Sequence, residues 1–288
     1  MPASKPSRTT RGTLYLVATP IGNLEDITLR ALRILREVDL IACEDTRHTQ
    51  KLLHHYEIRK ALVSYHEHNE RQRAPELVAR LERGENVALV SDAGTPIVSD
   101  PGHRLVALAI ESGIPVVPVP GASALLAALA ASGFPTDEFL FVGFLPARAG
   151  ERRRALERLA GEPRTLVFFE APHRLRASLE AALGVLGDRR AVIARELTKV
   201  HEEFHRGALR ELLESLPEPR GEMTVLIAAA VEDKVSTART ASRGSLADRV
   251  EELMRTKDLD RKAALKQAAR ERGISKRDAY RQLLSQRE

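Results

Sequence analysis

Short hydrophobic runs alternate with longer stretches of helical periodicity through residues 13–120. The runs are rich in Val, Leu, Ile and Ala, and several end at Gly, Pro, Asp or Ser, so they predict buried β-strands. We expect strands at residues 13–18, 38–42, 61–65, 87–91 and 115–119, and helices at 28–37, 46–56, 72–83 and 103–112. Strands that alternate with helices favour an α/β domain with a parallel sheet over residues 13–120.

A second set of patterns follows at residues 121–230 and predicts a second α/β domain. It opens with a run of small and apolar residues, Ala124 to Ser132, that is typical of a helix. Strand-like runs follow at 139–143, 165–169, 190–196 and 223–229, and helical patterns lie near 151–160, 173–183 and 208–215.

The two ends of the chain differ from these domains. Residues 1–12 are polar and basic without an apolar core, which indicates a disordered leader and not a signal peptide. Residues 231–244 are polar and lack periodicity, so we expect a linker. Three short helical patterns near 246–255, 260–271 and 275–284 then predict a small helical module at 245–288, resembling a helix-turn-helix. A plain packing bundle would give the same pattern.

Three loops that follow predicted strands are rich in glycine and other small residues. They begin after residues 18, 90 and 119, and the carboxyl ends of parallel strands meet at one edge of a sheet. We therefore expect a shared ligand pocket there. The loop at 91–102 carries two carboxylates, and no Lys or Arg lies between Asn86 and Gly102. That composition favours a ligand that is cationic or rich in hydroxyl and amino groups over a phosphate.

Charge and composition narrow the function classes. The formal net charge is +5, and residues 241–288, with 13 basic and 8 acidic side chains, account for all of it. A basic module beside a neutral body indicates a polyanionic partner such as nucleic acid, although a solvated helical surface would look similar. The single cysteine, Cys43, excludes an internal disulfide and is typical of a reducing cytosol. No apolar stretch is long enough to span a bilayer.

The loops also carry a resemblance to a known family. VATPIGNLED (17–26), ACEDTRHT (42–49), SDAGTPIVSDPG (91–102), PGAS (120–123), FFEAPHR (168–174) and ELTK (196–199) occur in this order, followed by EE at 202–203 and RG at 206–207. The set resembles the tetrapyrrole-methylase-like S-adenosylmethionine (SAM) methyltransferases. Within that family it is most similar to the branch that methylates the ribose 2′-hydroxyl of a cytidine in 16S rRNA.

The resemblance implies a two-domain fold that holds SAM between its α/β domains. It implies a homodimer in the cytoplasm that acts on 16S rRNA of the small ribosomal subunit, without a membrane. The second domain would close over SAM around Phe169 and the run that begins at Glu222. We therefore expect the cofactor to contact Pro20, Gly22, Asn23, Asp92, Ala93, Thr95, Pro96, Gly121, Ala122, Ser123, Phe169 and Met223. Asp92 is the expected polar anchor, or else it caps a turn through its side chain.

A ribose hydroxyl needs a group that removes its proton as the methyl group arrives. The candidates for this general base are Glu170, His173 and Asp100, with Glu44 or Asp45 as further choices. Arg47 and Arg174 are candidates for contacts to RNA phosphates. Each of these residues could instead form a surface ion pair or a helix cap.

His201-Glu-Glu-Phe-His205 matches the H-E-x-x-H motif of zinc proteases. That chemistry needs both histidines on one helix and a third ligand downstream. Here the motif follows a β-prone run, Gly207 interrupts any helix, and no histidine follows His205. We therefore predict no metal site.

Two other functions stay open on the sequence. One is a SAM methyltransferase that acts on a tetrapyrrole, although a macrocycle needs no basic module. The other is a non-catalytic RNA-binding or ribosome-assembly factor, although intact SAM loops argue against it.

Overall fold

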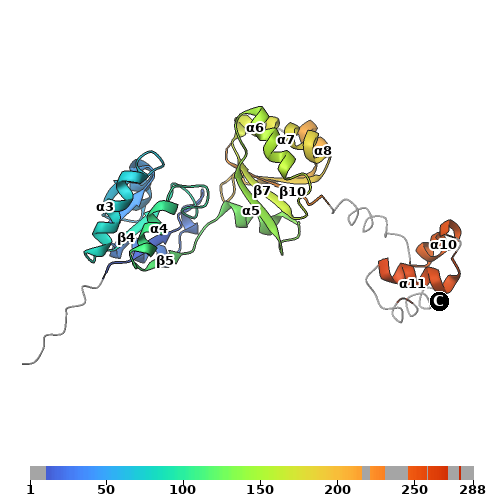
Figure 1. Cartoon of the computed structure of the whole chain (residues 1–288), viewed down its shortest axis with the longest axis horizontal. Coiled ribbons are helices and arrows are strands. Elements are labelled where there is room, and N and C mark those ends of the chain that lie inside the picture. The colour runs from blue at the N-terminus through green and yellow to red at the C-terminus, as the bar shows by residue number, and fades with distance from the viewer. Residues whose placement is uncertain (1–10, 216–220, 231–245, 258, 272–278, 280–288) are drawn as a thin grey trace, which may run out of the picture. The chain divides into compact units, whose positions relative to one another are not determined.

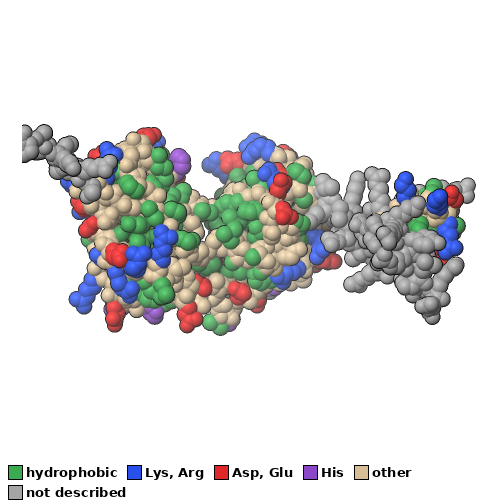
Figure 2. All heavy atoms as spheres, turned by 90° about the horizontal axis from the view of Figure 1, so that it is seen from below, with side chains coloured by type: hydrophobic (Ala, Val, Ile, Leu, Met, Phe, Trp, Pro, Cys, Tyr) green, Lys and Arg blue, Asp and Glu red, His purple; other side chains and the backbone are tan. Residues whose placement is uncertain are grey.

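The computed structural model describes residues 11–215, 221–230, 246–257, 259–271 and 279. By its internal contacts the chain divides into two compact units, Met1–Ala230 and Val231–Glu288. The first unit contains two five-stranded sheets (Figure 1). Figure 2 shows positive and negative side chains interspersed over its visible face, as expected from a region without net charge.

The first sheet is parallel throughout and has the order β3-β2-β4-β1-β5. Its strands are β1 (Leu14–Val17), β2 (Leu40–Cys43), β3 (Ala61–Ser64), β4 (Val87–Val90) and β5 (Val116–Val119). The helices are α1 (Leu29–Glu37), α2 (Thr46–His55), α3 (Glu70–Glu82) and α4 (His103–Glu111), with a short 3-10 turn, η1 (Leu24–Asp26), after β1. These elements confirm the α/β pattern predicted from the sequence.

Helices cover both faces of this sheet, which explains why its central strands are apolar throughout. α1 and α2 pack on one face around Ile34 and Leu53, and α3 and α4 pack on the other around Leu77 and Leu105. The chain moves from β1 outward to β3, and then β4 leads across β1 to β5. The strand order therefore reverses between β1 and β4, which is where open α/β sheets bind ligands at their carboxyl edge.

Residues 11 and 12 are ordered parts of the first α/β domain, because both form hydrogen bonds with it. The Gly12 amide donates to the Leu81 carbonyl at 2.8 Å, and Arg11 donates to the Gly113 carbonyl at 3.3 Å. The expected leader at 1–12 is therefore too long by these two residues, and residues 1–10 lie outside the described part.

The second sheet is mixed and has the order β6-β7-β10-β8-β9. β6 and β7 are parallel, and the remaining neighbours are antiparallel. Its strands are β6 (Phe139–Phe144), β7 (Thr165–Glu170), β8 (Arg190–Arg195), β9 (Glu203–Ala208) and β10 (Met223–Ile227). α6 (Ala149–Arg158), α7 (Pro172–Leu186) and α8 (Leu209–Ser215) cover one face, and α5 (Ala124–Ser132) covers the other.

Strand β9 was missed by the sequence analysis. It is an edge strand that pairs only with β8, so none of its residues is fully buried. No hydrophobic alternation therefore marks it. The strand also carries the second half of the H-E-x-x-H motif: His205 lies on β9, and His201 lies in the turn before it. The helix that a zinc protease needs is absent at this place, and within the described residues no group of three potential ligands gathers.

The second unit has a small core of its own. α10 (Leu246–Lys257) and α11 (Arg261–Glu271) pack together through residues that include Leu246, Val250, Ala264 and Ala268. Both helices were predicted from the sequence. The third, expected at 275–284, and the linker at 231–244 lie outside the described residues, except that Ala279 is helical and buried in this core. Among the described helices none is long and apolar enough to cross a membrane.

Candidate functional site

The loops that leave β1, β4 and β5 are tied to one another at the carboxyl edge of the first sheet. Thr19 and Gly94 exchange two backbone hydrogen bonds of 2.9 and 3.1 Å. The Thr19 hydroxyl donates to the Ser91 carbonyl at 3.2 Å, and the Thr95 hydroxyl donates to the Ala122 carbonyl at 3.3 Å. The predicted meeting of three glycine-bearing loops at one edge is therefore confirmed.

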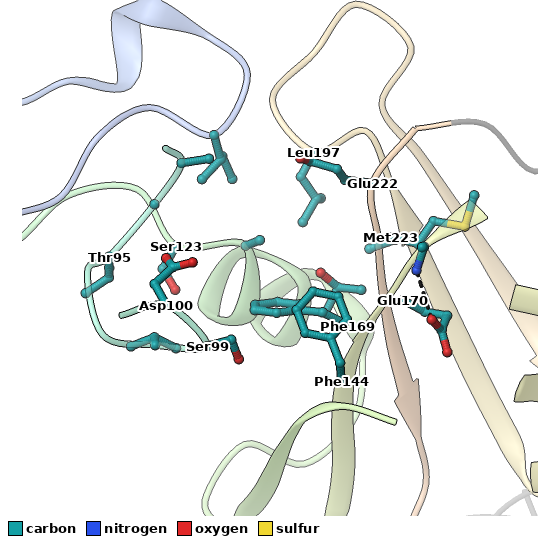
Figure 3. A pocket seen from close by; sticks show the side chains of 18 of the residues that line it. Thr95, Ser99, Asp100, Ser123, Phe144, Phe169, Glu170, Leu197, Glu222 and Met223 are labelled. Carbon is teal, nitrogen blue, oxygen red and sulfur yellow. Dashed lines mark hydrogen bonds between the residues drawn. The ribbon is translucent and has the colours of Figure 1, made fainter. Parts of the chain in front are cut away.

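These loops form one wall of a cavity of about 340 Å³. The second wall comes from the α5 face of the second sheet, at the ends of β6, β7, β8 and β10 (Figure 3). Of the residues predicted for the site, the cavity is lined by Asp92, Ala93, Thr95, Asp100, Ser123, Phe169, Glu170 and Met223. It is also lined by Glu222, where the expected run begins, and by residues without a predicted contact: Ile21, Gly94, Val98, Ser99, Ala124, Phe144, Ala171, Pro172, Ala194, Leu197 and Thr224.

The other predicted residues do not line the cavity. They are Pro20, Gly22, Asn23, Pro96, Gly121, Ala122, Glu44, Asp45, Arg47, His173 and Arg174. Some of them support its walls. The Asn23 side chain caps the turn η1. A Cβ on Gly121 would lie only 3.0 Å from the Cβ of Ala18. A larger residue at 121 would push the loops after β1 and β5 apart.

Two backbone segments beside the cavity adopt unusual conformations. Ile97 and Ser99 have φ angles of 76° and 67°, and Glu196 and Thr198 have φ angles of 50° and 68°. Non-glycine residues rarely adopt positive φ, and such residues cluster at ligand sites because neighbouring structure holds them there. Ser99 and Leu197 line the cavity from these two segments.

Lys199 links the second of these segments to the loop after β1. Its amino group lies 2.8 Å from a carboxylate oxygen of Glu196 and 3.6 Å from one of Glu222. Its hydrocarbon stem passes so close to Gly22 that a Cβ there would lie 2.4 Å from Lys199 Cγ. Gly22 is therefore explained by packing: only a residue without a side chain leaves room for the lysine stem.

Asp100 is the carboxylate on the cavity wall with a shifted pKa. Burial raises the pKa of Asp100 to about 6, with further contributions from the negative charges of Glu44 and Asp92, and the Ser91 hydroxyl opposes the rise. Burial also raises the pKa of Glu44, whose neighbours include Asp92 and His66. Asp92 itself accepts a hydrogen bond from the Asp45 amide at 3.1 Å, so it fixes the loop after β2 to the loop after β4.

Glu170 lies on the cavity wall, but its carboxylate is directed away from the cavity. Residues alternate along β7, so Phe169 faces the cavity while the Glu170 carboxylate points away from it (Figure 3), toward Ser178 of α7. There it is 2% exposed, accepts hydrogen bonds from the Ala171 amide and the Ser178 hydroxyl, and pairs with Arg174 at 3.2 Å. Arg174 also donates to the Leu145 carbonyl, so this buried group joins β7, α7 and the segment after β6.

The remaining predicted polar residues lie on the surface. His173 is exposed on the first turn of α7. Arg47 is exposed and pairs with Asp45 at 2.9 Å, and hydrogen bonds from the Arg47 side chain and amide hold the pKa of Asp45 at about 2. The Asp45 carboxylate also accepts the Arg47 amide and thereby caps α2.

Comparison with known proteins decides the family. The family model described as Tetrapyrrole (Corrin/Porphyrin) Methylases matches residues 13–213. The chain belongs to the tetrapyrrole methylase family. It is 48% identical over 275 residues to a ribosomal RNA small subunit methyltransferase I from Halalkalibacterium halodurans, covering 95% of each chain. It is 50% identical over 273 residues to a protein of the same name from Synechocystis, covering 93% of this chain and 96% of that one.

Solved structures of other methyltransferases share the fold of this chain. A cobalt precorrin-4 methyltransferase matches with a TM-score of 0.57 at 18% identity, over 77% of this chain and 97% of that one. A uroporphyrin-III C-methyltransferase from Thermus thermophilus, complexed with S-adenyl homocysteine, matches with a TM-score of 0.53 at 23% identity, over 77% and 100%. The predicted family and two-domain fold are thereby confirmed, and the chain is a methyltransferase of this family.

Proposed function

We propose that this methylase transfers a methyl group from SAM to the ribose 2′-hydroxyl of a cytidine in 16S rRNA of the small ribosomal subunit. The observation that carries the proposal is the near full-length identity of about half to relatives named for small-subunit rRNA. That identity extends beyond the methylase region at 13–213 into the basic C-terminal unit. The fold alone decides no substrate, because its members act on unrelated molecules.

The cavity residues suit SAM. Among the described residues no Lys or Arg lines the cavity, and Asp92, Asp100 and Glu222 place acidic groups around it, which favours a sulfonium cation and an ammonium group. Ile21, Phe169 and Leu197 offer apolar surface for an adenine and a thioether. Gly94 has a φ of 83°, and a Cβ there would lie 3.3 Å from Ile21, so the loop packs without a side chain at this point.

SAM supplies a methyl group on a positively charged sulfur. The methyl carbon's bond to sulfur breaks as its bond to the ribose oxygen forms, and the hydroxyl proton must leave. We propose that Asp100 accepts this proton, because its carboxylate lies on the wall and its pKa of about 6 leaves it ionised yet basic at neutral pH. Glu170 is already occupied by Ser178, Arg174 and the Ala171 amide, so its proposed role is to hold the turn from β7 to α7.

Methyl transfer from tritiated SAM tests this function. Purified chain should label small ribosomal subunits that lack the modification, and should leave large subunits and uroporphyrinogen III unlabelled. A methyl group on the 2′-oxygen blocks attack on the neighbouring phosphate, so the labelled nucleotide should survive alkaline hydrolysis as part of a dinucleotide. Label on the macrocycle would favour a tetrapyrrole substrate. Subunit binding without labelling would favour an assembly factor.

A cytoplasmic homodimer goes with this proposal, since the chain resembles a family whose members pair their subunits. Sedimentation equilibrium of the active protein at micromolar concentration tests the pairing. A fully active monomer would contradict it.

A further inference from the structure

Phe144 stands at the rim of the cavity because of an irregularity in β6. Phe139, Leu140 and Phe141 pair in sequence with residues 165–167 of β7, but the next pair is Phe144 with Phe169. One extra residue is therefore inserted between Phe141 and Phe144, which is a β-bulge. Gly143, at a φ of 72°, supplies the conformation that the bulge requires.

The bulge changes the face of the sheet to which Phe144 belongs. In a regular strand Phe144 would share the face of Leu140 and Val142, which pack against the core beneath α6 and α7. Instead it lies beside Phe169, on the face of Phe141. The ring centroids of Phe141 and Phe169 are 5.0 Å apart and those of Phe169 and Phe144 are 5.7 Å apart. Three rings thus run from the core to the rim of the cavity.

The ring of Phe144, at the outer end of this row, is exposed to solvent. Phe144 is 52% exposed, although its pocket neighbours Phe169 and Leu197 are largely covered. In a regular strand this large aromatic side chain would be buried, whereas in the bulged strand it is exposed to water. The lost burial lowers the stability of the fold. Bulges beside active sites characteristically redirect one side chain, so a ligand for the redirected ring is expected.

Phe144 and the proposed proton acceptor lie on opposite sides of the cavity. Ser99, next to Asp100, approaches the bulge so closely that a Cβ on Gly143 would lie 3.3 Å from its hydroxyl oxygen. Figure 3 shows Ser99 and Asp100 on one side and the rings of Phe144 and Phe169 on the other. A nucleoside entering between them can present its ribose to Asp100 and a face of its base to Phe144.

We propose that Phe144 is the platform on which the base of the acceptor nucleotide stacks while its ribose hydroxyl enters the cavity. This assignment rests on the proposed function, because it takes an RNA nucleotide as the substrate. A base that leaves its RNA stack loses neighbouring bases, and stacking on an aromatic side chain replaces part of that contact. The ring is thus a specificity element for a nucleotide and holds the ribose in place.

Positively charged side chains follow Phe144 closely in the sequence, and they suit an RNA strand. Arg148 lies four residues after Phe144 as the N-cap residue of α6, and its side chain is 85% exposed. Its contact with Glu151 is long, at 3.4 Å, and surface ion pairs of this kind contribute little, so a phosphate can compete with Glu151 for the guanidinium. Arg153, 69% exposed on the same helix, pairs with Glu157 at 2.9 Å, so Arg148 is the arginine assigned to the phosphate.

The test compares four variants in methyl transfer to small ribosomal subunits: Phe144→Leu, Phe144→Tyr, Phe144→Trp and Ile110→Ala. Phe144→Leu keeps an apolar side chain without an aromatic face, and its kcat/KM for the subunit should fall about ten- to a hundredfold. Phe144→Tyr and Phe144→Trp keep the face and should stay within about threefold of the wild type. Ile110, which is 62% exposed on α4 and does not line the cavity, serves as the control and should have no effect.

Calorimetric SAM affinity, thermal unfolding and sedimentation of each variant separate the other roles. The proposal requires that Phe144→Leu leave all three within experimental scatter of the wild type. A matching loss of SAM affinity would make Phe144 a cofactor contact, and a change of oligomeric state would make it a subunit contact; either overturns the proposal. So does full activity of Phe144→Leu. A wild-type protein that labels no RNA would instead refute the proposed function itself.

Discussion

Asp100 and Asp45 belong to one cluster of loops, but their surroundings shift the pKa values of the two carboxyl groups in opposite directions. Hydrogen bonds from Arg47 hold the pKa of Asp45 at about 2, whereas burial together with Glu44 and Asp92 raises the pKa of Asp100 to about 6. A proton acceptor is most effective when its pKa lies near the working pH. Asp100 therefore fits that role, and Asp45 serves to cap α2.

Replacing Asp100 by Asn should lower kcat for subunit methylation by about a hundredfold, the lower part of the range for losing a general base. Wild-type activity should rise with pH through about 6 as Asp100 ionises, and the variant should lose this limb of the profile. Steady-state rates between pH 5 and 8 measure both effects. Asp137→Asn, at an exposed residue outside the cavity, is the matched control. A wild-type limb that persists in Asp100→Asn would exclude Asp100 as its source.

The raised pKa of Asp100 also predicts how the stability of the fold depends on pH. The dependence runs opposite to that of a carboxylate held in an ion pair, whose pKa is lowered. The folded protein holds the Asp100 proton more tightly than the unfolded chain, whose pKa is near 3.8. The contribution of Asp100 to the free energy of unfolding therefore falls as pH rises from about 4 through 6. Asp100→Asn should accordingly unfold at a higher temperature than the wild type at pH 7.5, and this gain should vanish near pH 4. An unchanged difference at both values would contradict the shift.

The sequence motifs indicate which loops line the cavity, but they do not indicate the direction in which each side chain points. Asp92, Thr95 and Ser123 were singled out from their motifs and do lie on the cavity wall. Glu170 was an equally plausible base, because nothing in FFEAPHR tells that its carboxylate meets Ser178, two turns further along α7. Phe144 carried no motif signal at all, since its place depends on a bulge that only strand pairing reveals.

At the scale of elements, the contact between Gly22 and Lys199 joins the loop after β1 to the segment between β8 and β9. Gly22→Ala should destabilise the protein by about 1–3 kcal/mol and weaken SAM binding, because the added methyl group displaces the lysine stem. In a Lys199→Ala background the same change should cost much less, since the obstructing atoms are gone. Thermal unfolding and calorimetry of the four proteins measure this coupling.

A matched control lies in α7, where a Cβ on Gly184 would meet nothing within 4 Å. Gly184→Ala should stabilise the helix by about 0.5–1 kcal/mol. Equal costs of Gly22→Ala in both backgrounds would show that backbone conformation, and not the lysine, explains the glycine.

Element prediction succeeded where burial leaves a periodic pattern. The apolar strands of the first sheet lie between helices on both faces, so their sequences stand out, and the same holds for β7 and β10. Element prediction failed at β9, which has no fully buried residue because the strand forms an edge. The strand expected at 139–143 stopped one residue short, because Gly143 reads as a strand end but forms the bulge that leads to Phe144.

At the scale of the molecule, the second unit carries the net charge and has a core separate from that of the methylase unit. Deleting residues 231–288 should leave SAM affinity and the unfolding temperature of the remainder unchanged, since the cavity-lining residues that the structure describes lie before residue 231. Methylation of the small subunit should fall through weaker binding, and the dependence of binding on salt should become shallower as phosphate contacts are lost.

Calorimetry with SAM and subunit binding at two salt concentrations measure these effects in the full and truncated chains. Unchanged subunit binding would show that the basic charge is only a solvated surface. Loss of SAM affinity would show that the second unit supports the cavity.

Cys43, the chain's single cysteine, lies at the end of β2 with no exposed surface. Burial raises the pKa of its thiol, and its sulfur donates a hydrogen bond to the Val63 carbonyl at 3.7 Å, so the reactive thiolate form is suppressed. The wild-type chain should thus give little background with maleimide reagents. A cysteine introduced at exposed Ile110 or Leu126 could then carry a fluorophore or spin label at one defined place. The fold thus offers spectroscopists a scaffold from which no native thiol has to be removed.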